Sequence, residues 1–314
     1  MRNPLGRYLR VAGVITAVTG GLIAGITPAQ AGTPLNTNIP TRYTAQNLDW
    51  HQCAADEVNL PAGAPADLVK ALQCATFGAP RDWDHPGQGP DLTIAVSRLA
   101  ATGTATVSVI TNPGGPGEPG RWFPIALAGQ TALRAPQEVI GLEVRGTGKS
   151  TTISCGGDGA DLAKLDDNAD ALAATEFATR CNDTRFAGGD RASLMRTSQR
   201  LLDQGLTIYG GNQLDQPCAF WPSHPKPAPA MTGRGVPPVL MVAADRDPWT
   251  PIEGVRNAHA AFQHSRLLTV TGEGDHGVYA LTGNTAVDNI VNNFLVDGVL
   301  PPDESVPGMP LPTP

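Results

Sequence analysis

Strand-like and helix-like segments alternate along the chain, and this alternation is the strongest constraint on its fold. The segments with strand character, bounded by turn residues, are residues 92–99, 106–111, 138–144, 239–243 and 267–270. The segments with helical character are residues 121–134, 160–180, 251–262 and 287–295. Such alternation predicts an α/β fold, in which flanking helices cover both faces of a mostly parallel sheet.

A glycine-rich loop, residues 112–117 with the sequence NPGGPG, lies between the second strand and the first helix. Glycine allows backbone N–H groups to approach a ligand closely, and hydrolases use such groups to bind a developing oxyanion. An ordinary Gly/Pro turn is the alternative interpretation. The position between a strand and a helix favours the functional one.

An acid and a histidine follow the last two strands. Asp247 comes directly after strand 239–243, where a triad acid could orient an imidazole, although an Asp before Pro and a helix is also a good helix cap. Asp245 is a weaker choice for the acid. His276 stands in a Gly-flanked loop after strand 267–270, about thirty residues beyond Asp247, where a triad base is expected. We therefore predict Asp247 and His276 as catalytic residues.

The nucleophile that should accompany this pair is missing. The elbow sequence G-x-S-x-G occurs nowhere in the chain, although the order of the triad places it before the acid. Ser150 and Ser154 each have only one of the two required glycines, and neither leads from a strand into a helix. In the elbow-like residues 206–212 the serine position is Asn212, which cannot attack a carbonyl as an alkoxide can. We assign no nucleophile.

No cofactor or metal is expected. The sequence GTGKS at residues 146–150 suggests a phosphate loop, but that motif needs a glycine where Glu143 stands. The pattern GxGxxG occurs only within the glycine loop, at residues 115–120, and the histidine loop, at residues 272–277, and neither match supports dinucleotide binding. The cysteines and histidines lack zinc-site spacing.

Residues 1–31 have the pattern of a secretory signal peptide: three arginines, an apolar run and an Ala-Gln-Ala cleavage site. A membrane anchor is the alternative, but the run is short and rich in glycine. We expect a secreted protein that leaves the membrane after cleavage. The chain has 22 basic and 29 acidic residues and a formal net charge of −7, which argues against nucleic acid as a partner.

The chain has five cysteines, and an oxidising compartment would allow disulfides. Sequence proximity and neighbouring turn residues favour the pairs Cys53–Cys74 and Cys181–Cys218. Cys155 is then left over, and we expect it to be a free or intermolecular thiol.

The chain resembles the secreted tripeptidyl-aminopeptidase-like α/β-hydrolases of actinobacteria, including their TAP-like C-terminal domain. The similar segments are collinear and cover nearly the whole mature chain: residues 50–53, 92–98, 112–117, 145–150, 181–184, 218–222, 247–251 and 287–298. The resemblance implies a truncated α/β-hydrolase fold without the central elbow strand and most of the lid. The junction falls near residues 156–177.

The resemblance also implies a domain layout. Residues 1–31 form the signal peptide, 32–160 the N-terminal half with the oxyanion loop, and 161–237 the junction and lid remnant. Residues 238–300 form the C-terminal half with the acid and histidine loops, and 301–314 a flexible tail.

Two functions follow from these observations. In the first, the protein is a serine hydrolase that acts on a peptide or small ester. His276 is then the general base, Asp247 orients it, and the N–H groups of Gly114 and Gly115 bind the oxyanion. Without the serine this activity is weak or lost. In the second, the chain is a non-catalytic binding module or a remnant of an internal deletion.

Overall fold

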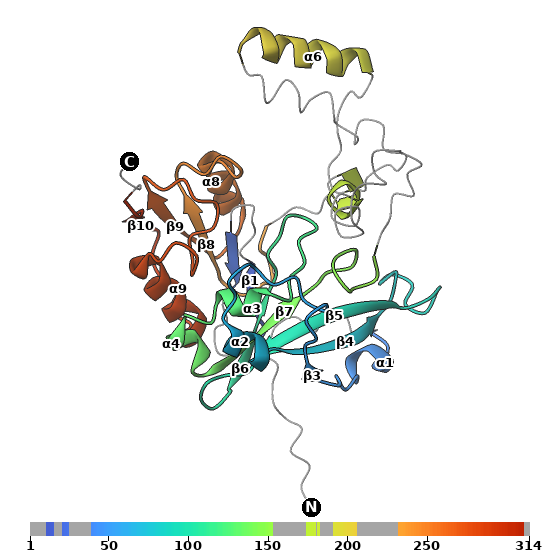
Figure 1. Ribbon diagram of the computed structural model, residues 1–314. Helices are drawn as coiled ribbons and strands as arrows, with labels where there is room; N and C mark the ends of the chain where they lie inside the picture. Colours follow the sequence, from blue (N-terminus) through green and yellow to red (C-terminus); the bar gives the residue numbers. More distant parts are fainter. Residues whose placement is uncertain are drawn as a thin grey trace, which may run out of the picture. The chain divides into compact units, whose positions relative to one another are not determined.

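The computed structural model describes residues 39–152, 174–179, 181–182, 191–205 and 232–310, and the backbone of two short N-terminal strands (Figure 1). The chain divides into two compact units. The first comprises Met1–Thr152 and Met231–Pro314, and the second comprises Ile153–Ala230. The second unit includes α6 (Arg191–Asp203), a helix that we did not predict.

The first unit is built on one sheet with the strand order β10-β9-β8-β2-β1-β6-β7-β5-β4-β3. The strands are β1 (Val11–Ile15), β2 (Gly21–Ala24), β3 (His51–Gln52), β4 (Gln73–Ala79), β5 (Leu92–Leu99), β6 (Val107–Thr111), β7 (Gln137–Leu142), β8 (Val239–Ala244), β9 (Ser265–Thr271) and β10 (Glu304–Pro307). The pairs β1–β6, β6–β7, β8–β9 and β9–β10 are parallel. The other described pairs are antiparallel, so the sheet is mixed rather than mostly parallel.

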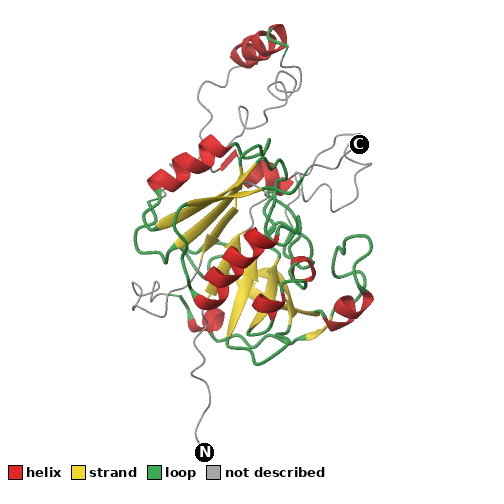
Figure 2. Cartoon of the chain, turned by 90° about the vertical axis from the view of Figure 1, so that its left-hand side faces the viewer, coloured by secondary structure: helices red, strands yellow, loops and turns green. Residues whose placement is uncertain are grey.

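Helices cover both faces of the sheet around β8. Alternate side chains of a strand point to opposite faces. Accordingly, Leu240, Val242 and Ala244 belong to a core cluster with residues of α9 (Thr285–Asp297). The alternate residues, Val239, Met241 and Ala243, pack instead with residues of α8 (Ile252–Ala261). Figure 2 shows the helices against the strands, and the predicted α/β class is confirmed.

The predicted helix 121–134 forms two short helices, α3 (Phe123–Ala126) and α4 (Thr131–Arg134), with Gly129 between them. Two further short helices, α1 (Thr41–Thr44) and α2 (Ala66–Ala71), precede β3 and β4. The tail predicted to be flexible contains β10, because Glu304–Pro307 pairs with β9. Among the described residues, no helix has the length and apolar character needed to cross a membrane.

One hydrophobic core joins the two halves of the first unit. The core cluster includes these buried residues before position 150: Val109, Phe123, Leu127, Leu133 and Val139. From the part after position 230 it includes Leu240, Val242, Leu268, Val270, Val287, Val291, Phe294 and Leu295, among others. The halves are therefore held together by burial of shared apolar surface, the dominant favourable term in folding.

A buried polar network crosses the same boundary. Gln130 donates from Nε2 to Asp288 Oδ2 at 2.9 Å and accepts from Asn292 Nδ2 at 2.8 Å. Asn292 Oδ1 in turn accepts from the hydroxyl of Tyr279 at 2.7 Å. Nearby, Gln137 donates to the Leu295 carbonyl at 2.8 Å. The side-chain nitrogen of Asn292 thus bonds to the first half, and its side-chain oxygen bonds to the second half.

Replacing Asn292 should weaken this junction. We expect Asn292→Ala to lower the free energy of unfolding by about 1–3 kcal/mol, because it leaves buried partners without hydrogen bonds. Asn293→Ala is the matched control, since Asn293 is exposed on the same helix and should change stability by less than about 0.5 kcal/mol. Urea unfolding measures both; equal effects would show that the network does not couple the halves.

Candidate active site

The three loops predicted to carry chemistry leave the sheet at the same edge. β1 is parallel to β6, and β2 is antiparallel to both β1 and β8, so β6 and β8 run in the same direction. β9 is parallel to β8. The carboxyl ends of these three strands therefore lie together, which is where ligands bind in open α/β sheets.

Asp247 and His276 form a close pair. Nδ1 of His276 lies 2.6 Å from Oδ2 of Asp247, and the side chains are only 14% and 6% exposed. Since an ionised carboxylate only accepts hydrogen bonds, Nδ1 must carry the proton and donate it. This arrangement leaves Nε2 as the basic nitrogen, as a triad histidine requires.

Asp247 is fixed by its own loop. Oδ1 accepts from the backbone N–H groups of Trp249 at 2.8 Å and Thr250 at 3.1 Å, and Oδ2 accepts from the Thr250 hydroxyl at 2.6 Å. Burial by itself would raise the pKa of Asp247, but the hydrogen bonds from Thr250, His276 and the backbone outweigh it and lower that pKa. The carboxylate is therefore ionised and held in place for His276.

Nε2 of His276 is buried and has no hydrogen-bond partner within the part of the chain that the structure describes. Buried polar atoms in proteins nearly always have a partner, so one without a partner needs an explanation. In a triad, Nε2 accepts a hydrogen bond from the nucleophile. No described side chain therefore takes the place of a nucleophile at Nε2 of His276.

Backbone bonds tie the acid loop to the histidine loop. The N–H of Arg246 donates to the Glu273 carbonyl at 3.0 Å, and the N–H of Gly272 donates to Asp245 Oδ1 at 2.8 Å. Asp245, the weaker choice for the acid, therefore holds the start of the histidine loop. The geometry favours Asp247 as the acid.

The buried carboxylate of Glu273 organises the histidine loop, a role that the sequence did not reveal. Oε1 accepts from the N–H groups of Gly274 at 2.9 Å and Asp275 at 3.1 Å, and Oε2 accepts from that of Met309 at 3.1 Å. The segment after β10 is thereby fastened to the loop that carries His276. Gly308 allows the close approach, since a Cβ there would lie 2.7 Å from Glu273 Cβ.

The glycine loop has a backbone conformation that favours glycine, and its two proposed oxyanion donors differ. Gly114, Gly115 and Gly117 all have positive φ angles, of 94°, 110° and 108°. The N–H of Gly114 donates to the side chain of Asn112 at 3.2 Å. The N–H of Gly115 donates no hydrogen bond to any described residue. Gly115 is therefore the stronger candidate for an oxyanion donor.

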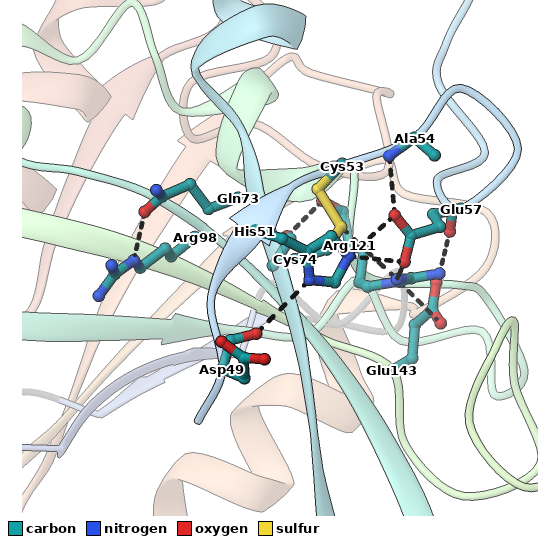
Figure 3. The surroundings of a disulfide bond; sticks show 11 residues. Asp49, His51, Cys53, Ala54, Glu57, Gln73, Cys74, Arg98, Arg121 and Glu143 are labelled. Carbon is teal, nitrogen blue, oxygen red and sulfur yellow. Dashed lines mark hydrogen bonds and ion pairs between the residues drawn. A yellow bond between two sulfur atoms is a disulfide. The ribbon is translucent and has the colours of Figure 1, made fainter. Parts of the chain in front are cut away.

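A buried ion pair lies next to this loop (Figure 3). Arg121 is 1% exposed, and its Nε lies 3.1 Å from Glu143 Oε2. The guanidinium also donates to the Glu57 carbonyl and, from Nη1, to Cys74 Sγ at 3.6 Å. Burial raises the pKa of Glu143, and the neighbouring Arg121 charge and the Lys149 N–H offset part of that shift. The pair fixes Arg121, four residues after Gly117.

The motif GTGKS wraps around this carboxylate. The N–H of Lys149 donates to Glu143 Oε2 at 2.7 Å. Gly148 has a φ of 52°, and a Cβ there would lie within 2.5 Å of the Glu143 carboxylate. The loop therefore binds an anion inside the protein, as backbone nests do. It is a structural element of this chain, and this supports our rejection of a phosphate loop.

Ser150 is a structural serine. Its hydroxyl donates to the Glu143 carbonyl at 2.6 Å and accepts from the Ala95 N–H at 2.8 Å. Both bonds are buried, so the oxygen has no access to a substrate. Ser154 and Asn212 lie outside the described residues.

A second Ser-His-Asp cluster occurs at the end of α8, and no sequence motif indicated it. Nδ1 of His259 lies 2.7 Å from Ser265 Oγ, and Nε2 lies 3.3 Å from Asp303 Oδ2. Ser265 is buried and its hydroxyl donates to the Phe262 carbonyl at 2.9 Å. Because a hydroxyl has one hydrogen, Ser265 caps the helix rather than acting as a nucleophile.

The predicted disulfide Cys53–Cys74 is confirmed, with Cα atoms 4.9 Å apart. Cys181 is also disulfide-bonded, but its partner lies among the residues that are not described. Cys155 and Cys218 fall there too, so the pair Cys181–Cys218 stays a prediction. Across the described ranges, no cluster of three or more His, Cys, Asp or Glu residues could hold a metal ion.

An Asp–His pair at the carboxyl edge of an α/β sheet, with a glycine loop at the same edge, defines the α/β-hydrolase class. Residues 207–307, which contain both Asp247 and His276, match the family described as TAP-like protein. This part of the chain is thus similar to the TAP-like α/β-hydrolases.

Individual relatives agree with this family. Tripeptidyl aminopeptidase of Streptomyces lividans is 33% identical over 122 residues, which cover 38% of this chain and 22% of that protein. Carboxylesterase B of Mycobacterium tuberculosis is 34% identical over 156 residues, 48% of this chain and 28% of the relative. Serine protease Hip1 of M. tuberculosis is 30% identical over 109 residues, 33% and 19% of the two chains. The matches thus span less than a third of each relative.

Among solved structures, the PEG-bound complex of a novel cold-adapted esterase from an Arctic intertidal metagenomic library matches with a TM-score of 0.33. The identity is 12%, over 74% of this chain and 98% of that chain. The assignment of the fold rests on the strand order and the helix layers described above.

The lowered pKa of Asp247 predicts a pH effect. The ionised form is favoured in the folded protein, so its contribution to stability is present above the ordinary pKa of 3.8 and is lost as the pH falls further. We expect the stability difference between the wild type and Asp247→Asn to shrink as the pH drops from 6 to below about 3. Chemical unfolding across this range measures it, with the exposed Asp297→Asn as control. A difference independent of pH would contradict the assignment.

Gly148→Ala should disrupt the loop around Glu143. The new Cβ would overlap the carboxylate and would need a left-handed backbone, so we expect a loss of at least about 2 kcal/mol of stability. Gly254→Ala is the matched control. No atom would lie within 4 Å of its Cβ, and alanine in α8 should stabilise by about 0.5–1 kcal/mol. Thermal unfolding of both variants tests the contrast, and equal shifts would contradict it.

Proposed function

We propose that this chain is a TAP-like hydrolase that keeps the acid, the base and an oxyanion donor but has lost the covalent serine step. The observation that carries this proposal is the Asp247–His276 pair, in which Nε2 of His276 has no partner among the described residues. A serine in G-x-S-x-G does not occur in the sequence. The chemistry that remains is general-base activation of water by His276, with Gly115 as oxyanion donor.

Such chemistry is weak. Removing members of a catalytic triad costs about 10⁶-fold in kcat, and the remaining acceleration over water is about 10³–10⁴-fold. This residual activity comes from the oxyanion hole and from substrate binding. We therefore propose that this chain hydrolyses substrates at a small fraction of the rate of a relative with a serine, or not measurably.

The substrate class follows from the relatives. They include an aminopeptidase, a serine protease and a carboxylesterase. We propose a peptide or a small ester as the ligand of this site. The acidic balance of the chain supports neither nucleic acid nor an anionic membrane as a partner.

We further propose that the protein is secreted. The leader at residues 1–31 and the Cys53–Cys74 disulfide support export to an oxidising compartment.

A non-catalytic binding module, or a remnant of an internal deletion, is the second candidate function. It is favoured by one observation, the missing elbow. The Asp247–His276 pair does not exclude it, since both residues come from one half of the domain and are positioned by local loops. In this case the site binds a ligand without turning it over.

A fluorophosphonate probe distinguishes the serine mechanism from its loss. We expect no labelling of the purified, folded chain, and strong labelling of a full-length relative under the same conditions. Labelling of a serine, located by mass spectrometry, would instead reveal a nucleophile that the sequence does not show and would restore the complete mechanism.

Ester hydrolysis tests the remaining base. Slow release of p-nitrophenol from its acetate should fall by about tenfold or more in His276→Ala, because general-base catalysis typically contributes 10²–10⁴-fold. His85→Ala is the control, since His85 is exposed and pairs only with Asp82 among described residues. Equal rates for both variants would favour the binding module.

A further inference from the structure

The sheet has a place for two strands that the hydrolase halves do not fill. β6 and β8 belong to the two halves, and in the strand order two strands separate them. Neighbouring strands lie about 4.8 Å apart, so the gap between β6 and β8 is about 14 Å wide. In the α/β-hydrolase order, the missing elbow strand would lie next to the strand of the oxyanion loop, which here is β6.

The N-terminal hairpin, β1 (Val11–Ile15) and β2 (Gly21–Ala24), occupies this gap in the strand order. β1 pairs in parallel with β6, from Val11 opposite Ser108 to Val14 opposite Thr111. β2 pairs antiparallel with β8, from Gly21 opposite Val242 to Ala24 opposite Val239. The two strands also pair with each other. The hairpin therefore connects both sides of the gap by backbone hydrogen bonds.

An open gap would be costly. Every residue of β8 is buried, and β6 ends in buried Thr111. An unpaired edge on such strands leaves backbone N–H and C=O groups without partners and offers a template for another chain. The hairpin sequences contain no charged residue and are rich in β-branched residues, which suits them to a buried central position.

We propose that the leader has a second role, as a strand donor that closes the sheet in the uncleaved chain. The occupant of the gap is then the N-terminal hairpin of the same molecule, and removal of residues 1–31 opens the edges of β6 and β8. The role is independent of catalysis by His276, because it depends only on strand pairing.

A disulfide trap tests the pairing in the uncleaved chain of residues 1–314. Leu22 and Met241 are opposite each other in the antiparallel register, and such Cα atoms are about 4.5–5.5 Å apart, within disulfide range. We expect Leu22→Cys with Met241→Cys to form an intramolecular bond after mild oxidation, identified by peptide mapping. The control, Ile23→Cys with Met241→Cys, puts the two cysteines on opposite faces and should link at least tenfold less.

Each other outcome overturns the proposal. Equal linking of both variants would mean a mobile leader, and an intermolecular bond would mean that a second copy fills the gap. If the cysteine variants do not fold, amide hydrogen exchange of the unsubstituted chain tests the same strand pairing. Amides of Ser108–Thr111 and Val239–Val242 should exchange as slowly as those of β5, which has strands on both sides. Fast exchange in β6 and β8 alone would show that the gap is open.

Discussion

The shared hydrophobic core is the constraint on which the rest of the structure depends. Val109 and Phe123 from one half lie in the same cluster as Leu240 and Phe294 from the other. This core packs against one sheet, in which the strand pairing makes β6 and β8 run in the same direction. Their carboxyl ends then place the glycine loop and the Asp247–His276 pair at one edge. Without the core, these motifs would be unrelated features of two fragments.

Local sequence was sufficient wherever an element is defined by its own residues. The strand predicted at residues 92–99 is β5, and Asp247 and His276 meet because each follows a strand of the predicted parallel pair. Contacts between distant segments were not accessible in this way. β10 forms because it pairs with β9. The motif GTGKS binds the buried carboxylate of Glu143, and no sequence pattern predicted that this residue is buried. The Gly114 N–H donates to the Asn112 side chain, a local turn contact that our sequence analysis did not consider.

The site is incomplete in a specific way. Its acid and base need only the loops after β8 and β9, and hydrogen bonds within those loops hold them. The oxyanion loop likewise needs only β6 and its neighbours. A nucleophile needs a strand between these two groups, and the N-terminal hairpin occupies that position with no elbow sequence. In the function that we propose, proton transfer and charge stabilisation are therefore separable from covalent catalysis.

The attachment of the C-terminal segment to Glu273 has a practical consequence for handling the protein. Met309 is bonded to the carboxylate that shapes the histidine loop, and Asp303 contacts His259 and the backbone of Leu267. A purification tag fused after Pro314 would thus begin only five residues from a contact of the active-site scaffold. Shortening the chain to position 302 to aid crystallisation would remove the contacts of both Asp303 and Met309. Purification tags and truncations therefore belong elsewhere in the sequence.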